Sequence, residues 1–60
     1  MNKKLKMLRI EKEYTQDDLA RKSGVSRASI VQIERGKQLP CLETAKKIAK
    51  ALDTTVEKIF

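Results

Sequence analysis

Residues 15–35, TQDDLARKSGVSRASIVQIER, constrain the fold most strongly, because they predict two short helices separated by a tight turn. Thr15 is a good N-cap, and two acids follow it in the first turn, where the helix dipole favours negative charge. Gly24 can adopt a positive φ without steric cost, which lets the chain turn between the helices. Ser26 is predicted to cap the second helix, and Gly36 to end it.

The second of these helices has two chemically different sides. At about 100° per residue, Ile30, Ile33 and Glu34 share one side. The opposite side carries a small residue, an amide and a guanidinium, namely Ala28, Gln32 and Arg35. An amide can pair with adenine, a guanidinium with guanine, and an alanine can contact a thymine methyl group. The pattern therefore favours a helix that buries one side and can offer the other to DNA bases.

The stretch resembles the helix-turn-helix of the Cro and phage-repressor family. The phrases TQDDLA, SGVSRASI and IERGK look like signatures of that family. Its glutamine, alanine, glycine and apolar positions are matched by Gln16, Ala20, Gly24, Val25, Ile30 and Ile33. Continued through LPCLETAKKIAKAL and TTVEKIF, the resemblance covers essentially the whole chain. Ser23 departs from the pattern, since an apolar residue is usual there, and it is expected to loosen the turn.

The resemblance implies an all-α fold, namely a compact five-helix, lambda-repressor-like DNA-binding domain whose helices 2 and 3 form the helix-turn-helix. Residues 1–60 are expected to form this single domain, because so short a chain has room for only one small core. The first helix is expected within residues 1–13, where Leu5 and Leu8 are spaced for one face. With only two aromatic residues in the chain, the core must be aliphatic.

Two further helices are expected after Pro40. Apolar residues at i, i+3 and i+4 spacing define the buried side of the fourth, and these are Leu42, Ala45, Ile48, Ala49 and Leu52. Cys41 stands at the N-cap of this helix, although cysteine caps poorly. Thr55 is expected to cap a short fifth helix.

Charge and composition narrow the possible partners. The formal net charge is +6, which suggests an acidic partner such as nucleic acid, with an anionic membrane as the other possibility. Three lysines near the N-terminus, Lys3, Lys4 and Lys6, are either a solvated face or a phosphate-facing end. No apolar run is long enough for a membrane span or signal peptide, so a cytoplasmic protein without a membrane partner is expected. A single Cys and no His leave no metal site or internal disulfide, and no cofactor or small-molecule ligand is expected.

The resemblance also implies which residues contact double-stranded DNA. The second helix of the motif would enter the major groove and read base edges through Arg27, Ala28 and Gln32. Phosphate contacts are expected from a second set, Gln16, Ser26, Ser29, Arg35 and Lys37. Val31 could either meet a thymine methyl group or fill a gap.

Arg9 and Glu34 occupy positions at which the family pairs a first-helix arginine with a glutamate of the recognition helix. The resemblance therefore implies a partly buried salt bridge between the first and third helices. A direct contact of Arg9 with DNA is the alternative role.

These features favour a sequence-specific transcriptional regulator, most simply a repressor that binds a palindromic operator as a homodimer. In related proteins the C-terminal part pairs the subunits, which implies an interface at Thr54, Val56, Ile59 and Phe60. The alternative is an antitoxin-like or other protein-interaction module whose main partner is a protein. An enzyme is disfavoured, because the chain has neither a His nor a glycine-rich phosphate loop.

Overall fold

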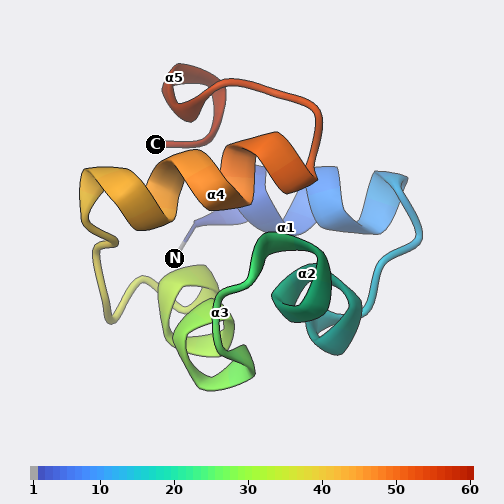
Figure 1. The fold of residues 1–60 in the computed structure, drawn as a ribbon, viewed down its shortest axis with the longest axis horizontal. Helices are drawn as coiled ribbons and strands as arrows, with labels where there is room; N and C mark the ends of the chain where they lie inside the picture. Colours follow the sequence, from blue (N-terminus) through green and yellow to red (C-terminus); the bar gives the residue numbers. More distant parts are fainter. Residues whose placement is uncertain (1) are drawn as a thin grey trace.

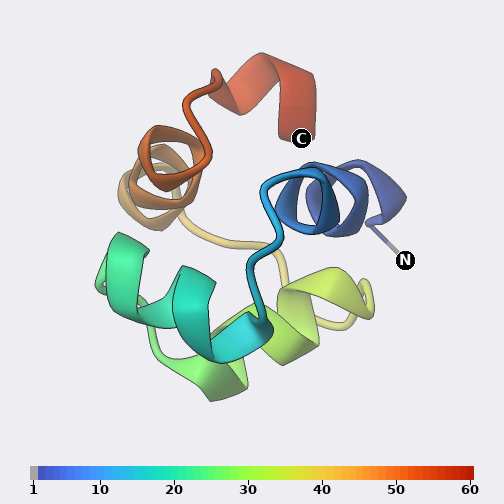
Figure 2. The same cartoon turned by 90° about the vertical axis from the view of Figure 1, so that its right-hand side faces the viewer.

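The computed structural model describes residues 2–60, which form five helices joined by short loops (Figure 1). The helices are α1 (Lys3–Glu11), α2 (Gln16–Ser23), α3 (Arg27–Glu34), α4 (Leu42–Ala51) and α5 (Val56–Ile59). In both Figure 1 and Figure 2, α5 lies on one side of α4, while α2 and α3 lie on the other. The predicted all-α, five-helix fold is therefore confirmed.

The turn between α2 and α3 forms as its residues predict. The Thr15 side chain accepts a hydrogen bond from the Asp18 N–H at 3.0 Å, and the Asp18 carboxylate accepts one from the Thr15 N–H at 2.9 Å. This reciprocal capping box begins α2. Gly24 ends α2 with a φ of 75°, and the Ser26 hydroxyl accepts a hydrogen bond from the Ser29 N–H at 3.2 Å. Each helix thus begins at a side-chain cap that binds one of its first N–H groups, and Gly24 makes the turn between the two helices.

Ser23 belongs to this turn and does not loosen it. The side chain is buried, and its hydroxyl donates to the Leu19 carbonyl at 2.7 Å. The same oxygen accepts a hydrogen bond from the Val25 N–H at 3.3 Å. These hydrogen bonds compensate the hydroxyl for the water that it loses on burial and tie it to both sides of the turn, so the expected loosening was wrong.

The core is aliphatic, as the composition predicts, and all five helices contribute to it. Its buried members are Leu5, Leu19, Ile30, Ile33, Ile48, Ala49, Leu52 and Ile59. Leu8 and the Tyr14 ring pack against this cluster from α1 and the α1–α2 loop. The α4 prediction was wrong for Leu42, whose side chain is 63% exposed. Leu42 is the first residue of α4, one turn ahead of Ala45, where the helix first reaches the core.

Asn2 ties the beginning of the chain to two distant helices. Its side-chain oxygen accepts a hydrogen bond from the Leu5 N–H at 3.1 Å and so caps α1. Its Nδ2 donates to the Ile59 carbonyl at 3.2 Å, and its backbone N–H donates to the Glu34 carbonyl at 3.0 Å. One residue therefore links α1, α3 and α5. Within residues 2–60, every helix is too short or too polar to cross a lipid bilayer.

Candidate nucleic-acid interface

The two sides of α3 are as different in the structure as in the sequence. Ile30, Ile33 and Glu34 are buried, as predicted. The opposite side, here called the open face, consists of Ala28, Gln32 and Arg35, with Arg27 at its N-terminal end. Ala28, Arg27 and Arg35 are exposed, and Gln32 is half-buried. No other helix lies beyond α2 and α3 on this side of the molecule (Figure 1). The open face can therefore approach a large partner.

An ion pair between Arg9 and Glu34 joins α1 to the buried side of α3. Arg9 Nε donates to Glu34 Oε2 at 2.7 Å, and Arg9 Nη2 donates to Glu34 Oε1 at 3.1 Å. The remaining nitrogen, Nη1, donates to the Tyr14 carbonyl at 2.8 Å. The side chains are only 11% and 6% exposed. The bidentate pair with Glu34 and the hydrogen bond to Tyr14 together engage all three guanidinium nitrogens. This geometry supports the structural role of Arg9 over a direct contact with DNA.

A shallow pocket of about 380 Å³ lies beside this pair, lined by Lys6, Arg9, Gln16, Glu34 and Arg35. The charges of Arg9 and Glu34 offset each other. Lys6 and Arg35 form no salt bridge with any residue in 2–60. Gln16 is the first residue of α2, where backbone N–H groups lack helical partners. The pocket thus combines two free cations, an amide side chain and a helix N-terminus, a combination suited to a phosphate oxygen.

Asp18 adds a carboxylate to the same helix N-terminus. The hydrogen bond from the Thr15 N–H, followed by the one with the Thr15 side chain, holds the pKa of Asp18 below its ordinary value. Arg21 also forms an ion pair with it. Asp18 therefore stays ionised and is held by Thr15 and Arg21, so it does not compete with a phosphate for the cations of the pocket.

The other predicted phosphate ligands lie at the two ends of α3. The Ser26 hydroxyl donates to Ser29 Oγ at 3.0 Å while it caps the helix, so the Ser29 hydroxyl proton remains available to an external acceptor. Lys37 is exposed in the loop after α3. The structure thus brings Gln16 and Arg35 into one pocket, pairs Ser26 with Ser29, and leaves Lys37 outside both groups.

Arg27 and Asp17 form an ion pair that sequence analysis missed. Arg27 Nε lies 3.2 Å from Asp17 Oδ1, and the pair connects the beginnings of α3 and α2. Both side chains are well exposed, at 62% and 70%. The two residues are ten positions apart on separate helices, so no local spacing rule indicates the contact.

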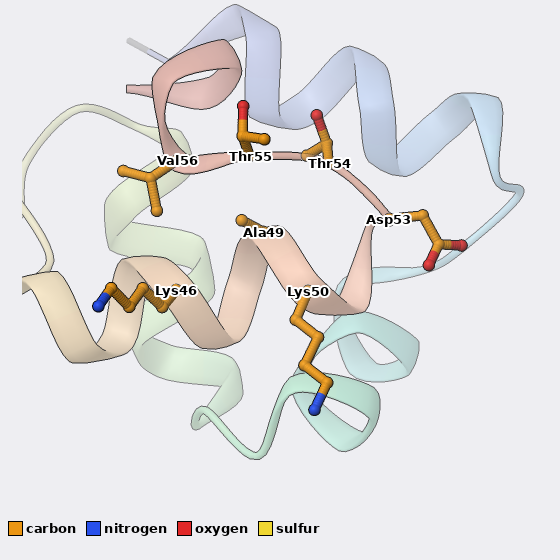
Figure 3. Close-up of a pocket in the computed structure, with 7 residues that line it drawn as sticks. All are labelled: Lys46, Ala49, Lys50, Asp53, Thr54, Thr55 and Val56. Carbon is orange, nitrogen blue, oxygen red and sulfur yellow. The ribbon is translucent and has the colours of Figure 1, made fainter.

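The predicted dimer residues line two different grooves or are buried. Thr54 and Val56 line a groove of about 390 Å³ between α4 and α5, together with Lys46, Ala49, Lys50, Asp53 and Thr55 (Figure 3). Phe60 is exposed, but it lines a different groove of about 580 Å³ that also includes Leu39. Ile59 is buried in the core of its own chain, so its assignment to an exposed interface was wrong. The α1 and α4 helices cover the inner side of α5, where Ile59 lies.

Leu39 is the most exposed large apolar side chain in residues 2–60, and sequence analysis gave it no role. Its side chain is 90% exposed in the loop between α3 and α4. An apolar residue that lies in a loop, next to Pro40 and outside any helical repeat, is the signal that could have identified it.

Comparisons with known proteins agree with this geometry. A helix-turn-helix family model matches residues 5–59. An uncharacterized HTH-type transcriptional regulator of Methanocaldococcus jannaschii is 50% identical over 60 residues, which is all of this chain and 91% of that protein. The crystal structure of the restriction-modification controller protein C.AhdI from Aeromonas hydrophila matches with a TM-score of 0.92 and 34% identity, over 98% of this chain and 89% of that one.

A chain of the SinR/SinI protein complex also matches with a TM-score of 0.92, at 32% identity, over 98% of this chain and 58% of that one. The sequence relatives and the solved structures thus point to the same fold and the same class of protein. The chain belongs to the Cro/C1-type helix-turn-helix family and is a DNA-binding transcriptional regulator.

Proposed function

We propose that this regulator recognises a specific double-stranded operator by placing α3 in the major groove. Arg27, Ala28 and Gln32 would contact the base edges. The observation that carries this proposal is the division of α3 into a fully buried side and an open face with hydrogen-bonding side chains. The exposed guanidinium of Arg27 suits guanine, the half-buried amide of Gln32 suits adenine, and the small methyl group of Ala28 allows close approach to thymine.

Phosphate contacts would set the position of α3 in the groove. Gln16 and Arg35 share one pocket with Lys6, which has no salt-bridge partner among residues 2–60. The Ser29 hydroxyl, near the N-terminal end of α3, donates to no acceptor within the described part of the chain. Ser26 and Lys37 would extend this set along the backbone. Such contacts carry little sequence information, but they fix the register from which bases are read.

The regulator would act as a symmetric homodimer on a palindrome. A single α3 covers only about three to five base pairs, which are too few to distinguish one genomic site from its competitors. A second copy doubles the contacts. The remaining candidates for the interface are the half-buried Thr54 and Val56 in the α4–α5 groove and the exposed Phe60 in the neighbouring groove. Two copies of α3 about 34–36 Å apart would read half-sites centred about 10–10.5 base pairs apart.

Selection of bound duplexes from a random pool tests both parts of the proposal. A two-fold symmetric motif and a complex that sediments with two protomers are expected. A motif without symmetry, saturated by one protomer, would contradict the dimer. Absence of any selected motif would contradict sequence-specific recognition.

Repression would follow from occupation of a promoter, since a bound dimer excludes polymerase from the same DNA. Transcription in vitro from a promoter that contains the selected operator measures the sign directly. Lower transcript yield on addition of the protein is expected, and a higher yield would identify an activator.

A protein partner is the second candidate function, and Leu39 is the observation in its favour. A leucine side chain exposed to 90% beside a groove that also contains Phe60 offers an apolar contact for another protein. A salt-sensitive mobility shift on the selected operator, obtained with the purified chain alone, would argue against a function that depends on such a partner.

A further inference from the structure

The Asp17–Arg27 ion pair joins the first turn of α2 to the first residue of α3, at the N-terminal end of the open face. The closest approach of the pair is 3.2 Å, between Asp17 Oδ1 and Arg27 Nε. The two terminal nitrogens, Nη1 and Nη2, have no hydrogen-bond partner among residues 2–60. The carboxylate therefore lies nearest to Nε, and the two terminal nitrogens keep their hydrogen-bonding capacity for another acceptor.

We propose that Asp17 is a positioning residue for base recognition, which orients Arg27 so that Nη1 and Nη2 meet the O6 and N7 acceptors of a guanine. This inference rests on the proposed function of Arg27. A free arginine samples many rotamers and loses that freedom when it binds a base edge. A contact that restrains the side chain before binding reduces the loss, and a contact at Nε selects the end-on mode of bidentate pairing.

If Asp17 orients Arg27, it affects the preference for guanine at one base pair. The charge of Asp17 alone would affect the affinity for every DNA sequence. A carboxylate on a DNA-facing surface repels phosphates whatever the sequence, so its removal should strengthen binding to every duplex alike. Orientation of Arg27 instead affects only the contrast between guanine and other bases at one position. The two effects can be separated by comparing a ratio of affinities with the affinities themselves.

The test uses the whole chain and two duplexes, the selected operator and the same operator with the Arg27-dependent guanine replaced. The discrimination ratio is the dissociation constant for the replaced operator divided by that for the selected one. D17N should lower this ratio about two- to fivefold, the range that exposed ion pairs can supply. Binding to unrelated duplexes should stay equal or become tighter, which also shows that the variant is folded.

Glu11→Gln is the matched control, because it removes the same charge from an exposed residue at the end of α1 that makes no ion pair within residues 2–60. It should leave the ratio unchanged. In a background of Arg27→Ala, D17N should also leave the ratio unchanged, because the side chain that Asp17 orients is gone.

Failure of this inference is distinguishable from failure of the proposed function. If Arg27→Ala relaxes no base preference, Arg27 is not a base-reading residue and both ideas fail. If Arg27→Ala relaxes one base pair while D17N leaves the ratio unchanged, base reading by Arg27 stands and the positioning role of Asp17 is overturned. An equal drop in the ratio for Glu11→Gln would overturn it as well, because net charge would then explain the effect.

Discussion

The α2–α3 unit and the α4–α5 unit are similar in size but are held together differently. In the first, Thr15 and Ser26 both cap their helices with side-chain hydrogen bonds. In the second, Cys41 and Thr55 occupy the N-cap positions without any side-chain cap. The α4–α5 unit depends instead on burial of apolar residues in the shared core.

Under the proposed function, this difference separates base recognition by the α2–α3 unit from assembly through the α4–α5 unit. Base recognition requires side chains held in a fixed position, and short-range hydrogen bonds within α2 and α3 supply that rigidity. The α4–α5 unit closes the core, and its exposed groove leaves freedom for a contact between protomers (Figure 3). Changes in the first unit should therefore alter DNA reading, whereas changes in the second should alter assembly.

The largest expected effect comes from the contact that anchors α3 to α1. Glu34→Ala leaves the buried Arg9 charge unpaired and should lower the free energy of unfolding by about 3–5 kcal/mol. Denaturation in urea measures this change. The double variant with Arg9→Ala should cost less than the sum of the two single changes, and strict additivity would show that the pair contributes no coupling.

The second effect concerns the open face. Arg27→Ala and Gln32→Ala should each weaken binding to the selected operator by about 1–3 kcal/mol and relax preference at one base pair. Gln16→Ala serves as the contrast, since loss of a phosphate contact should weaken all duplexes similarly. An unchanged motif and affinity for Gln32→Ala would show that the proposed register of α3 is wrong.

A smaller effect is expected from a change at the end of the α4–α5 unit, which tests the role of this unit in dimer assembly. Phe60→Asp places a charge on an exposed apolar position and should weaken binding to the full palindrome by about 1–2 kcal/mol, within the range for interface residues. Binding to an isolated half-site should change little. Titration of both duplexes gives the two values, and equal losses on both would remove Phe60 from the interface.

The contrast in capping can be measured with one pair of matched substitutions. Thr15→Ala should cost about 1 kcal/mol in the free energy of unfolding, because the capping box is lost. Thr55→Ala should cost less than about 0.5 kcal/mol, since its side chain makes no cap hydrogen bond. Equal costs at both positions would break the comparison between the two units.

The smallest effect should be a gain in stability. Cys41→Ser places a better cap at the N-terminus of α4, where the cysteine makes no cap hydrogen bond. Its thiol contacts Thr44 Oγ1 at 3.3 Å instead. The expected increase is a few tenths of a kcal/mol, measured as a higher urea midpoint. A lower midpoint would mean that the thiol contact contributes more than a cap.

The amino-acid sequence by itself determined the helix-turn-helix and the division of α3 into two sides. Thr15, Gly24 and Ser26 act on residues no more than four positions away, so their effects can be predicted without knowledge of the fold. The aliphatic character of the core also follows from composition alone, because the chain has almost no aromatic residues.

In the α4–α5 unit the apolar pattern predicted the buried side of α4, and only the tertiary structure decided the exposure of Leu42 and the burial of Ile59. Ile59 and Leu42 both fit an apolar helical pattern, yet Ile59 is enclosed and Leu42 is exposed. The distinction depends on which distant elements pack over each position, and Asn2 reaches Ile59 across 57 residues of sequence. The Asp17–Arg27 pair is of the same kind, since it exists only because α2 and α3 pack against each other. Local patterns specify how a helix forms, whereas burial and long-range pairing arise from the packing of the whole chain.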